Sequence, residues 1–168
     1  PLAVPLEHYV QRMCEFFDYW LRDTTCNIAV SYFENYIKYM LKGYKDLCCF
    51  NSCMGKHIGI HYDGTIYGCN RDFPKEYSFG NVMDYKDIHE CFDSAGFQRL
   101  LQSAIKRRTS CKEKCEIFDF CAGGCNSVAL VGGNLEEGNE YICSIRRQIY
   151  NYIAEKLVPL RTLKIEEL

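Results

Sequence analysis

Four cysteines that lie within fifteen residues constrain this chain more than any other feature. They are Cys111, Cys115, Cys121 and Cys125. The Lys, Glu and Asp residues between them favour water, so this stretch does not gather its thiols by burying them as apolar side chains. Gly123 and Gly124 would let backbone N–H groups approach charged sulfur atoms closely. Two Cys-x3-Cys halves separated by five residues therefore predict a loop that wraps a metal centre.

Disulfide bonds are the alternative explanation for so many cysteines, and the cellular compartment distinguishes the two. The chain has 168 residues, of which twelve are cysteine and 48% are hydrophobic, so it can fold around an apolar core without disulfides. We find neither a signal peptide nor an apolar run long enough to cross a membrane, and we expect a cytoplasmic protein with reduced thiols. Because the sequence begins Pro-Leu-Ala-Val-Pro without Met, we expect it to be part of a longer chain.

The charge distribution argues against a protein that binds nucleic acid. The formal net charge is −2 at pH 7, and basic residues are spread among acidic ones. The one basic run is Lys106-Arg107-Arg108. We predict that it lies at the C-terminal end of a helix, where cations interact favourably with the helix dipole, and we assign it no function.

The first 47 residues predict a helix, a strand and a second helix. Apolar side chains recur at helical spacing over residues 6–21, and residues 26–30 are expected to form a short strand. Residues 31–34 read Ser-Tyr-Phe-Glu, which predicts a capping box that opens a helix ending at Gly43. This order of elements is typical of the end of a larger α/β unit, most of which would lie upstream.

A second group of cysteines flanks a predicted β-hairpin. Residues 57–62 and 65–69 have strand character and are joined by the turn signal Asp63-Gly64. The hairpin would bring Cys53 and Cys69 toward the same end, which predicts a second metal half-site. His57 and His61 are acceptable zinc ligands. Because thiols are abundant nearby, we expect both histidines to be ordinary hydrogen-bonding residues of the hairpin.

Further helices are predicted in the second half of the chain. Ser94 is expected to cap a helix, and its apolar face would consist of Phe97, Leu100, Leu101, Ala104 and Ile105. A helical turn is expected at residues 126–131, and a final helix over residues 140–157 would be closed by Pro159. Cys143 stands near the start of this last helix, where it could supply a fourth sulfur for the loop.

Nine cysteines remain after Cys14, Cys26 and Cys91 are set aside as structural thiols. Eight of them can fill two sites of four sulfurs, and one of the adjacent pair Cys48 and Cys49 is then spare. Zinc and iron–sulfur clusters both take four thiolates, so the ligand count does not choose between them.

A longer pattern along the chain consists of Cys53, Gly64, Cys69, Cys111, Cys115, Cys121, Cys125 and Cys143. It resembles the seven-cysteine pattern of the SPASM domain, the C-terminal extension of many radical S-adenosylmethionine enzymes that modify peptides and proteins. The resemblance covers residues 48–158 and extends to the segment Gly80-Asn81-Val82. One spacing differs, because three residues rather than the usual two separate Cys111 from Cys115.

The resemblance implies two [4Fe–4S] clusters, each held by four cysteines. The ligands of the first would be Cys48, Cys53, Cys69 and Cys125, with Cys49 as the alternative to Cys48. The ligands of the second would be Cys111, Cys115, Cys121 and Cys143. The expected fold class is α+β, a small cysteine-rich domain with a β-hairpin and several helices wrapped around two metal clusters.

The resemblance also predicts the domain organisation. Residues 1–47 would be the end of a radical S-adenosylmethionine barrel and a bridging region, and residues 48–168 the SPASM-like auxiliary domain. The barrel signature Cys-x3-Cys-x2-Cys is absent, because Gly55 and Lys56 follow Cys53 where a third cysteine would be due. This chain alone is therefore not expected to cleave S-adenosylmethionine. That cofactor and a third [4Fe–4S] cluster would bind in the barrel, upstream in the same polypeptide.

The implied function is that of an auxiliary domain in an enzyme that modifies a ribosomally made peptide. Its clusters would relay an electron or bind the peptide, and its partners would be the barrel, the peptide and a reducing electron-transfer protein, with no nucleic acid or membrane. Sulfatase-maturing members carry an Asp base after the cysteine that ends the hairpin. Asn70 stands there in this chain and cannot take a proton, so we expect a different reaction, although Asp72 is a possible substitute. The alternative is a zinc-stabilised interaction module without a redox role.

Overall fold

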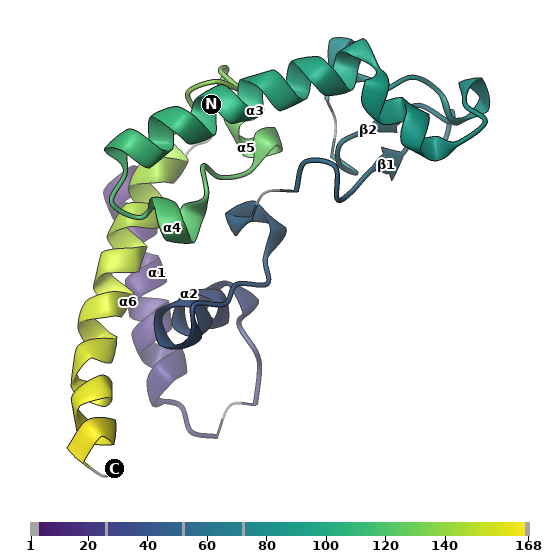
Figure 1. The fold of residues 1–168 in the computed structure, drawn as a ribbon. Coiled ribbons are helices and arrows are strands. Elements are labelled where there is room, and N and C mark those ends of the chain that lie inside the picture. The colour runs from purple at the N-terminus through teal and green to yellow at the C-terminus, as the bar shows by residue number, and fades with distance from the viewer. Residues whose placement is uncertain (1–3, 26, 52, 72, 167–168) are drawn as a thin grey trace. The chain divides into compact units, whose positions relative to one another are not determined.

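The computed structural model describes residues 4–25, 27–51, 53–71 and 73–166. The chain divides into two compact units. We call Pro1–Leu47 with Glu140–Leu168 the helical unit, and Cys48–Asn139 the cysteine-rich unit. The described residues are mostly helical and contain one small antiparallel hairpin (Figure 1), which confirms the predicted α+β class.

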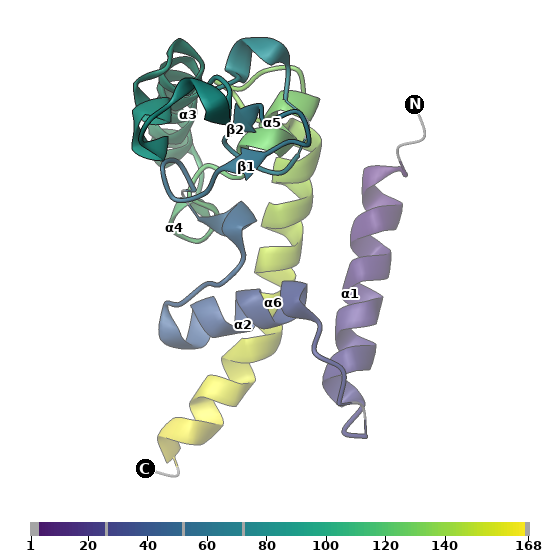
Figure 2. The ribbon, with the colours of Figure 1, turned by 90° about the vertical axis from the view of Figure 1, so that its right-hand side faces the viewer.

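Three helices make up the helical unit, as Figure 2 shows: α1 (Leu6–Arg22), α2 (Ser31–Lys42) and α6 (Glu140–Glu166). Aromatic rings pack between them. Phe17 and Phe33 are fully buried, with ring centroids 5.2 Å apart in an edge-to-face arrangement. The hydroxyl of Tyr152 donates to the carboxylate of Asp18 at 2.8 Å and so links α6 to α1.

The predicted strand in this unit is wrong for the residues that the structure describes. Residues 27–30 belong to no strand, and Cys26 lies outside the described residues. A strand needs a neighbour to pair with, and the described part of this unit offers none. The predicted capping box is also wrong, because Val30 rather than Ser31 takes the N-cap position and no side chain caps it.

The ends of α2 and α6 test two further predictions. Gly43 ends α2 with a φ of 68°, the left-handed conformation that favours glycine, as predicted. The prediction that Pro159 closes the last helix is wrong, because α6 continues to Glu166. A proline in a helix removes one backbone hydrogen bond and bends the helix without necessarily ending it.

Asn35 fixes the segment that follows α2. It is 1% exposed, and its Oδ1 atom accepts hydrogen bonds from the backbone N–H groups of Asp46 at 2.7 Å and Leu47 at 3.0 Å. A buried amide oxygen that satisfies two backbone donors holds this segment in one conformation. Residues 46 and 47 are therefore fixed relative to α2 within the helical unit.

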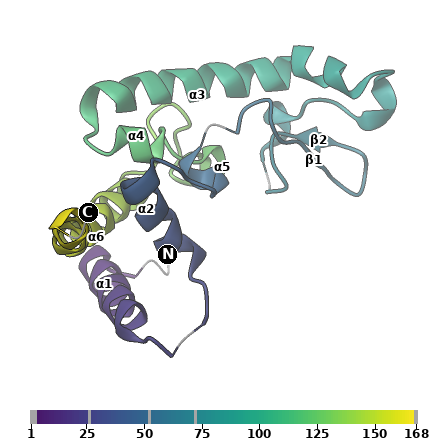
Figure 3. The ribbon, with the colours of Figure 1, turned by 60° about the horizontal axis from the view of Figure 1, so that its bottom comes forward.

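The cysteine-rich unit is built along one long helix, α3 (Ala95–Lys114). In Figures 1 and 3, the hairpin of β1 (Gly59–Ile60) and β2 (Ile66–Tyr67) lies toward the N-terminal end of α3, and α4 (Phe118–Cys121) lies toward its C-terminal end. The other elements are α5 (Asn126–Val131) and the 3-10 turns η1 (Cys48–Phe50), η2 (Lys75–Tyr77), η3 (Val82–Asp84) and η4 (Ile88–Asp93).

The predicted hairpin is confirmed, with shorter strands than expected. Gly59 pairs with Tyr67, and Ile60 with Ile66. Gly64 has a φ of 84° in the turn, and its carbonyl accepts a hydrogen bond from the N–H of Val82 at 2.9 Å. The hairpin is therefore held by the segment at Gly80-Asn81-Val82 as well as by its own pairing.

The core of this unit lies between the hairpin and the first half of α3. Phe79 and Phe97 are buried, with ring centroids 5.3 Å apart in an edge-to-face arrangement. Cys91 is fully buried among apolar side chains, as predicted. Cys14, in the helical unit, is only partly buried, and Ile105 is 53% exposed, so it does not belong to the apolar face of α3.

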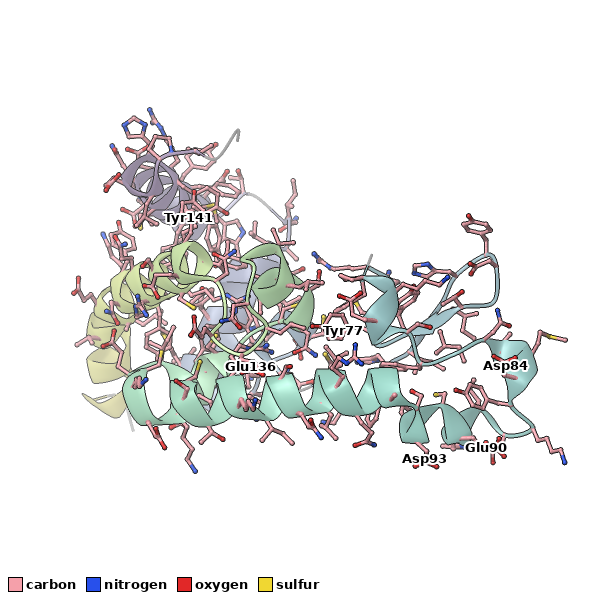
Figure 4. The ribbon with its side chains drawn as sticks, turned by 90° about the horizontal axis from the view of Figure 1, so that it is seen from above. Tyr77, Asp84, Glu90, Asp93, Glu136 and Tyr141 are labelled. Atoms are coloured by element: carbon pink, nitrogen blue, oxygen red, sulfur yellow. The ribbon has the colours of Figure 1, made fainter. Side chains whose placement is uncertain are left out.

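The predicted cap of α3 is present, because the Ser94 hydroxyl accepts a hydrogen bond from the N–H of Phe97 at 3.2 Å. Figure 4 shows Asp84, Glu90 and Asp93 at this end of the helix, where negative charge interacts favourably with the helix dipole. The other end differs from the prediction. Because α3 continues to Lys114, the run Lys106-Arg107-Arg108 lies inside the helix rather than at its end. No helix among the described residues is long and apolar enough to cross a membrane.

Gly96 is required where η2 packs on α3. A Cβ atom at this position would lie 1.8 Å from the carbonyl oxygen of Ser78. Gly-to-Ala changes usually stabilise a helix, but here we expect Gly96→Ala to lower the free energy of unfolding by about 1–3 kcal/mol, because the backbone must move apart. Urea unfolding checks this, with Thr109→Ala on the exposed face of α3 as the control. A Gly96→Ala protein as stable as the control would contradict this packing.

Candidate metal centres

Four cysteines of the cysteine-rich unit come from four separate segments. Cys48 begins η1, Cys53 follows that turn, Cys69 follows β2, and Cys125 is the N-cap residue of α5. Burial raises the pKa of the Cys53 thiol, and the negative charges of Cys125, Cys48 and Cys69 as thiolates raise it further. Asn126, next to Cys125, donates to the sulfur of Met54, next to Cys53, at 3.0 Å, so these two segments lie side by side. We call these four residues the first thiol group.

Three other cysteines gather at the C-terminal end of α3. Burial raises the pKa of Cys111, the charges of Cys115 and Cys121 raise it further, and nearby arginines lower it. Because Cys111 and Cys115 are four residues apart at the end of a helix, their side chains can share one face. The unusual three-residue spacing thus fits a helical turn, whereas the sequence had predicted a loop here. We call Cys111, Cys115 and Cys121 the second thiol group.

The other predicted ligands have different surroundings. Cys143 lies in α6, within the helical unit, and its part in a ligand set stays a prediction. Cys49 is partly buried in η1, and the charge of Cys48 is among those that act on Cys53. The ring of His61 packs on Tyr67, with centroids 4.7 Å apart. Within the described part of the chain, no three Cys, His, Asp or Glu residues have the geometry of a site for a single metal ion.

The segment between Cys121 and Cys125 makes a tight left-handed turn. The φ angles of Ala122, Gly123 and Gly124 are 53°, 80° and 74°. Glycine adopts this conformation without a steric penalty, whereas Ala122 is strained. The turn explains why two glycines are needed here, and it places Cys121 and Cys125 in different thiol groups although only three residues separate them.

Two arginine side chains of α3 bind this turn. The Nε atom of Arg107 donates to the carbonyl of Gly123 at 2.9 Å, and Arg108 donates to the carbonyl of Ala122 at 2.7 Å. Arg107 is only 1% exposed, so the sequence prediction that this basic run has no special role is wrong. The spacing of Arg107 in the sequence could have predicted its burial. It follows Leu100 by seven positions and Ala104 by three, which places it on the buried face of the helix.

Two aromatic rings join the segments that carry the cysteines. Phe50 in η1 and Phe120 in α4 are buried, with ring centroids 4.4 Å apart. A small cavity of about 10 Å³ is lined in part by Cys53, Gly124 and Arg107. The site therefore combines clustered thiols, a buried cation and an apolar wall.

A protein-family comparison matches residues 48–116. The matching family is SPASM, an iron–sulfur cluster-binding domain. The match confirms the resemblance predicted from the cysteine pattern and covers both hairpin cysteines and the first two cysteines of the second thiol group. We refer to residues 48–116 as the SPASM segment.

Sequence similarity to other proteins covers most of the chain. The chain is 23% identical over 154 residues to a cysteine-type anaerobic sulfatase-maturating enzyme of Clostridium perfringens strain 13, covering 90% of this chain and 41% of that protein. It is 24% identical over 127 residues to the enzyme of the same name from Clostridium novyi strain NT, covering 74% and 33%. The chain thus spans about two fifths or less of the length of these relatives.

Solved structures share the fold. The structure described as native anSMEcpe with bound AdoMet has a TM-score of 0.73 and 21% identity, covering 94% of this chain and 43% of that chain. A second, with bound AdoMet and the Kp18Cys peptide, has a TM-score of 0.71 and 21% identity, covering 94% and 44%. At this level of identity, the likeness establishes the fold.

The ring pair of Phe50 and Phe120 tests how the cysteine segments are held. We expect Phe120→Ala to lower the free energy of unfolding by about 3–5 kcal/mol, because it opens a cavity between η1 and α4. Chemical unfolding of the intact protein measures this. Val131→Ala, at a position that is 83% exposed, is the control and should change stability by less than about 0.5 kcal/mol. Equal stability of the two variants would contradict the assigned role of the rings.

Proposed function

We propose that this chain is the C-terminal part of a radical S-adenosylmethionine enzyme that modifies a peptide. In this proposal, residues 48–168 form an auxiliary domain that holds two [4Fe–4S] clusters. The observation that carries it is the match of residues 48–116 to the SPASM family, within a unit that contains seven of the predicted cysteine ligands. The similarity to sulfatase-maturating enzymes supports the class of enzyme.

The donor set of each thiol group fits an iron–sulfur cluster. Iron–sulfur clusters take soft thiolate ligands, and the first group brings four thiols together from four segments. Cys48, Cys53, Cys69 and Cys125 would hold one cluster, with Cys48 preferred over Cys49. The second group supplies three thiols, and Cys143 would be the fourth ligand. A bound cluster would supply a one-electron redox centre or an iron atom that binds a substrate atom.

The chain's own residues would control the surroundings of these centres. Phe50 and Phe120 would exclude water on one side. In the turn before Cys125, the Gly123 carbonyl accepts from Arg107 and the Gly124 N–H donates to the carbonyl of Cys121 at 2.9 Å. Limited access of water and hydrogen bonds near the sulfur atoms set the potential of a cluster. These features favour a redox role over a purely structural one.

The remaining parts of the enzyme would lie upstream. Residues 1–47 would be the end of the radical barrel and a bridge, and the barrel would bind S-adenosylmethionine and a third [4Fe–4S] cluster. The length of the relatives supports this, because the chain covers only 41% of one of them. A peptide substrate and a reducing electron-transfer protein would be the partners. We place the enzyme in the cytoplasm, where thiols stay reduced.

Asn70 suggests that this enzyme does not carry out the reaction of the sulfatase-maturing members, which use an Asp base at this position. Asn70 is exposed directly after Cys69, and the Cys69 thiol donates to its side-chain oxygen at 3.5 Å. An amide does not accept a proton at neutral pH, so Asn70 cannot act as a general base. Asp72, the possible substitute, lies outside the described residues. We therefore favour a cross-link in a ribosomally made peptide, through a thioether or a carbon atom.

Single cysteine substitutions in the full-length enzyme test the cluster assignment. We expect Cys53→Ala to lose the iron and sulfide of one cluster, because one of its four ligands is removed. Anaerobic iron analysis and visible absorbance measure the loss. Cys91→Ala, which removes a fully buried thiol from the apolar core, should lower stability but keep the iron. Colourless protein that contains zinc would instead favour the structural module.

The adjacent cysteines provide a finer test of the same assignment. Cys48→Ala should lower the iron content as Cys53→Ala does, whereas Cys49→Ala should retain it. The opposite result would identify Cys49 as the ligand. If both variants retain full iron, the first cluster has an open iron site.

The part played by Asn70 is tested with a cysteine-containing peptide, such as the Cp18Cys peptide bound to a solved relative. We expect the native enzyme to oxidise this peptide slowly or not at all. Asn70→Asp should raise the rate by about a hundredfold or more, because it restores a general base, and Asn70→Ser should not. Chromatography and mass spectrometry of the peptide measure the product. Rapid oxidation by the native enzyme would refute the proposed difference in reaction.

A further inference from the structure

Among the described residues, Arg107 has the largest side chain that is fully buried, with 1% of its surface exposed. Its guanidinium donates to the carbonyl of Gly123 at 2.9 Å, to the carbonyl of Leu135 and to the side-chain oxygen of Asn126. All three acceptors are electrically neutral. Each of its three nitrogen atoms thus donates one hydrogen bond, but these bonds leave the positive charge uncompensated.

A buried charge is costly unless an opposite charge lies close to it. No carboxylate among the described residues forms an ion pair with Arg107. Burial accordingly lowers the pKa of Arg107, whereas the thiolates of Cys111, Cys125 and Cys121 raise it. As cluster ligands these sulfur atoms would be thiolates, and Gly123 and Asn126, which accept hydrogen bonds from Arg107, lie on either side of Cys125 in the turn that separates the two thiol groups.

The backbone explains how one side chain can reach both groups. Cys111 follows Arg107 by four residues, one turn further along α3. Gly123, which accepts a hydrogen bond from Arg107, lies between Cys121 and Cys125, and Asn126 directly follows Cys125. Arg107 also lines the same cavity as Cys53. Its three hydrogen bonds hold the turn that separates the two groups.

We propose that Arg107 is a positioning residue that supplies one counter-charge to both thiol groups and thereby raises the reduction potentials of both clusters. This inference rests on the proposed function, because it requires that the thiols hold clusters. A cluster bound by four thiolates becomes more negative when it accepts an electron. A fixed positive charge nearby stabilises the reduced form more than the oxidised form, so the potential rises.

Lys106 provides a matched comparison on the neighbouring position of the same helix. Its side chain is 65% exposed and pairs with Glu136 at 3.0 Å, and Figure 4 shows Glu136 beside α3. Water screens an exposed ion pair of this kind, so its charge has little effect on a buried group. Lys106→Gln and Arg107→Gln therefore remove the same charge from the same helix at different depths.

The experiment measures the midpoint potentials of the auxiliary clusters in the full-length enzyme by redox titration with electron paramagnetic resonance. We expect Arg107→Gln to lower the midpoint potentials. The equilibrium constant for reduction should fall at least tenfold, which corresponds to about 59 mV for one electron. Arg107→Lys keeps the charge and should stay near the native value. Lys106→Gln should match the native enzyme.

A second variant serves if Arg107→Gln does not fold. Asn126→Asp keeps the hydrogen bonds of Arg107 but places a carboxylate against its guanidinium, so it should lower the potentials in the same direction. Potentials of either variant that equal those of Lys106→Gln would overturn the inference. A native enzyme without clusters would overturn the proposed function itself, so iron analysis of the native protein separates the two failures.

Discussion

The attachment of the turn between Cys121 and Cys125 to α3, through Arg107 and Arg108, is the constraint on which the arrangement of the cysteine-rich unit depends. The charges of Cys48, Cys69 and Cys125 act on Cys53, and those of Cys115 and Cys121 act on Cys111. Burial adds to this repulsion, because a charged sulfur loses its hydration. Such an arrangement favours neutral thiols unless a cationic centre binds them. In the proposed function, a bound metal centre would remove this cost and stabilise the unit.

The rest of the unit provides the rigid support that this arrangement needs. The hairpin and η2 pack on the first half of α3, and its second half carries Arg107, Cys111 and the turn that follows. One helix therefore connects the apolar core to the thiol groups. Binding sites supported by a rigid helix keep their geometry better than sites on isolated loops. This explains how a unit with only two short strands can position seven cysteines.

Local signals in the sequence accounted for much of the fold, and the cysteine pattern predicted the SPASM match. The turn at Asp63-Gly64 predicted the hairpin, Ser94 predicted the start of α3, and cysteine spacing predicted two sets of thiols. The errors came from interactions between residues far apart in the sequence. Residues 27–30 lack a strand to pair with, and the burial of Arg107 depends on acceptors 16 to 28 residues further along the chain. Local propensity does not encode such partners.

The central claim is that two iron–sulfur clusters occupy the two thiol groups. Anomalous diffraction at the iron absorption edge, from anaerobic crystals of the full-length enzyme, tests it most directly. We expect two separate four-iron peaks in this region, one beside Cys53 and Cys125 and the other beside Cys111 and Cys121. A zinc signal at these positions, a single iron site or disulfide bonds between these cysteines would contradict the account.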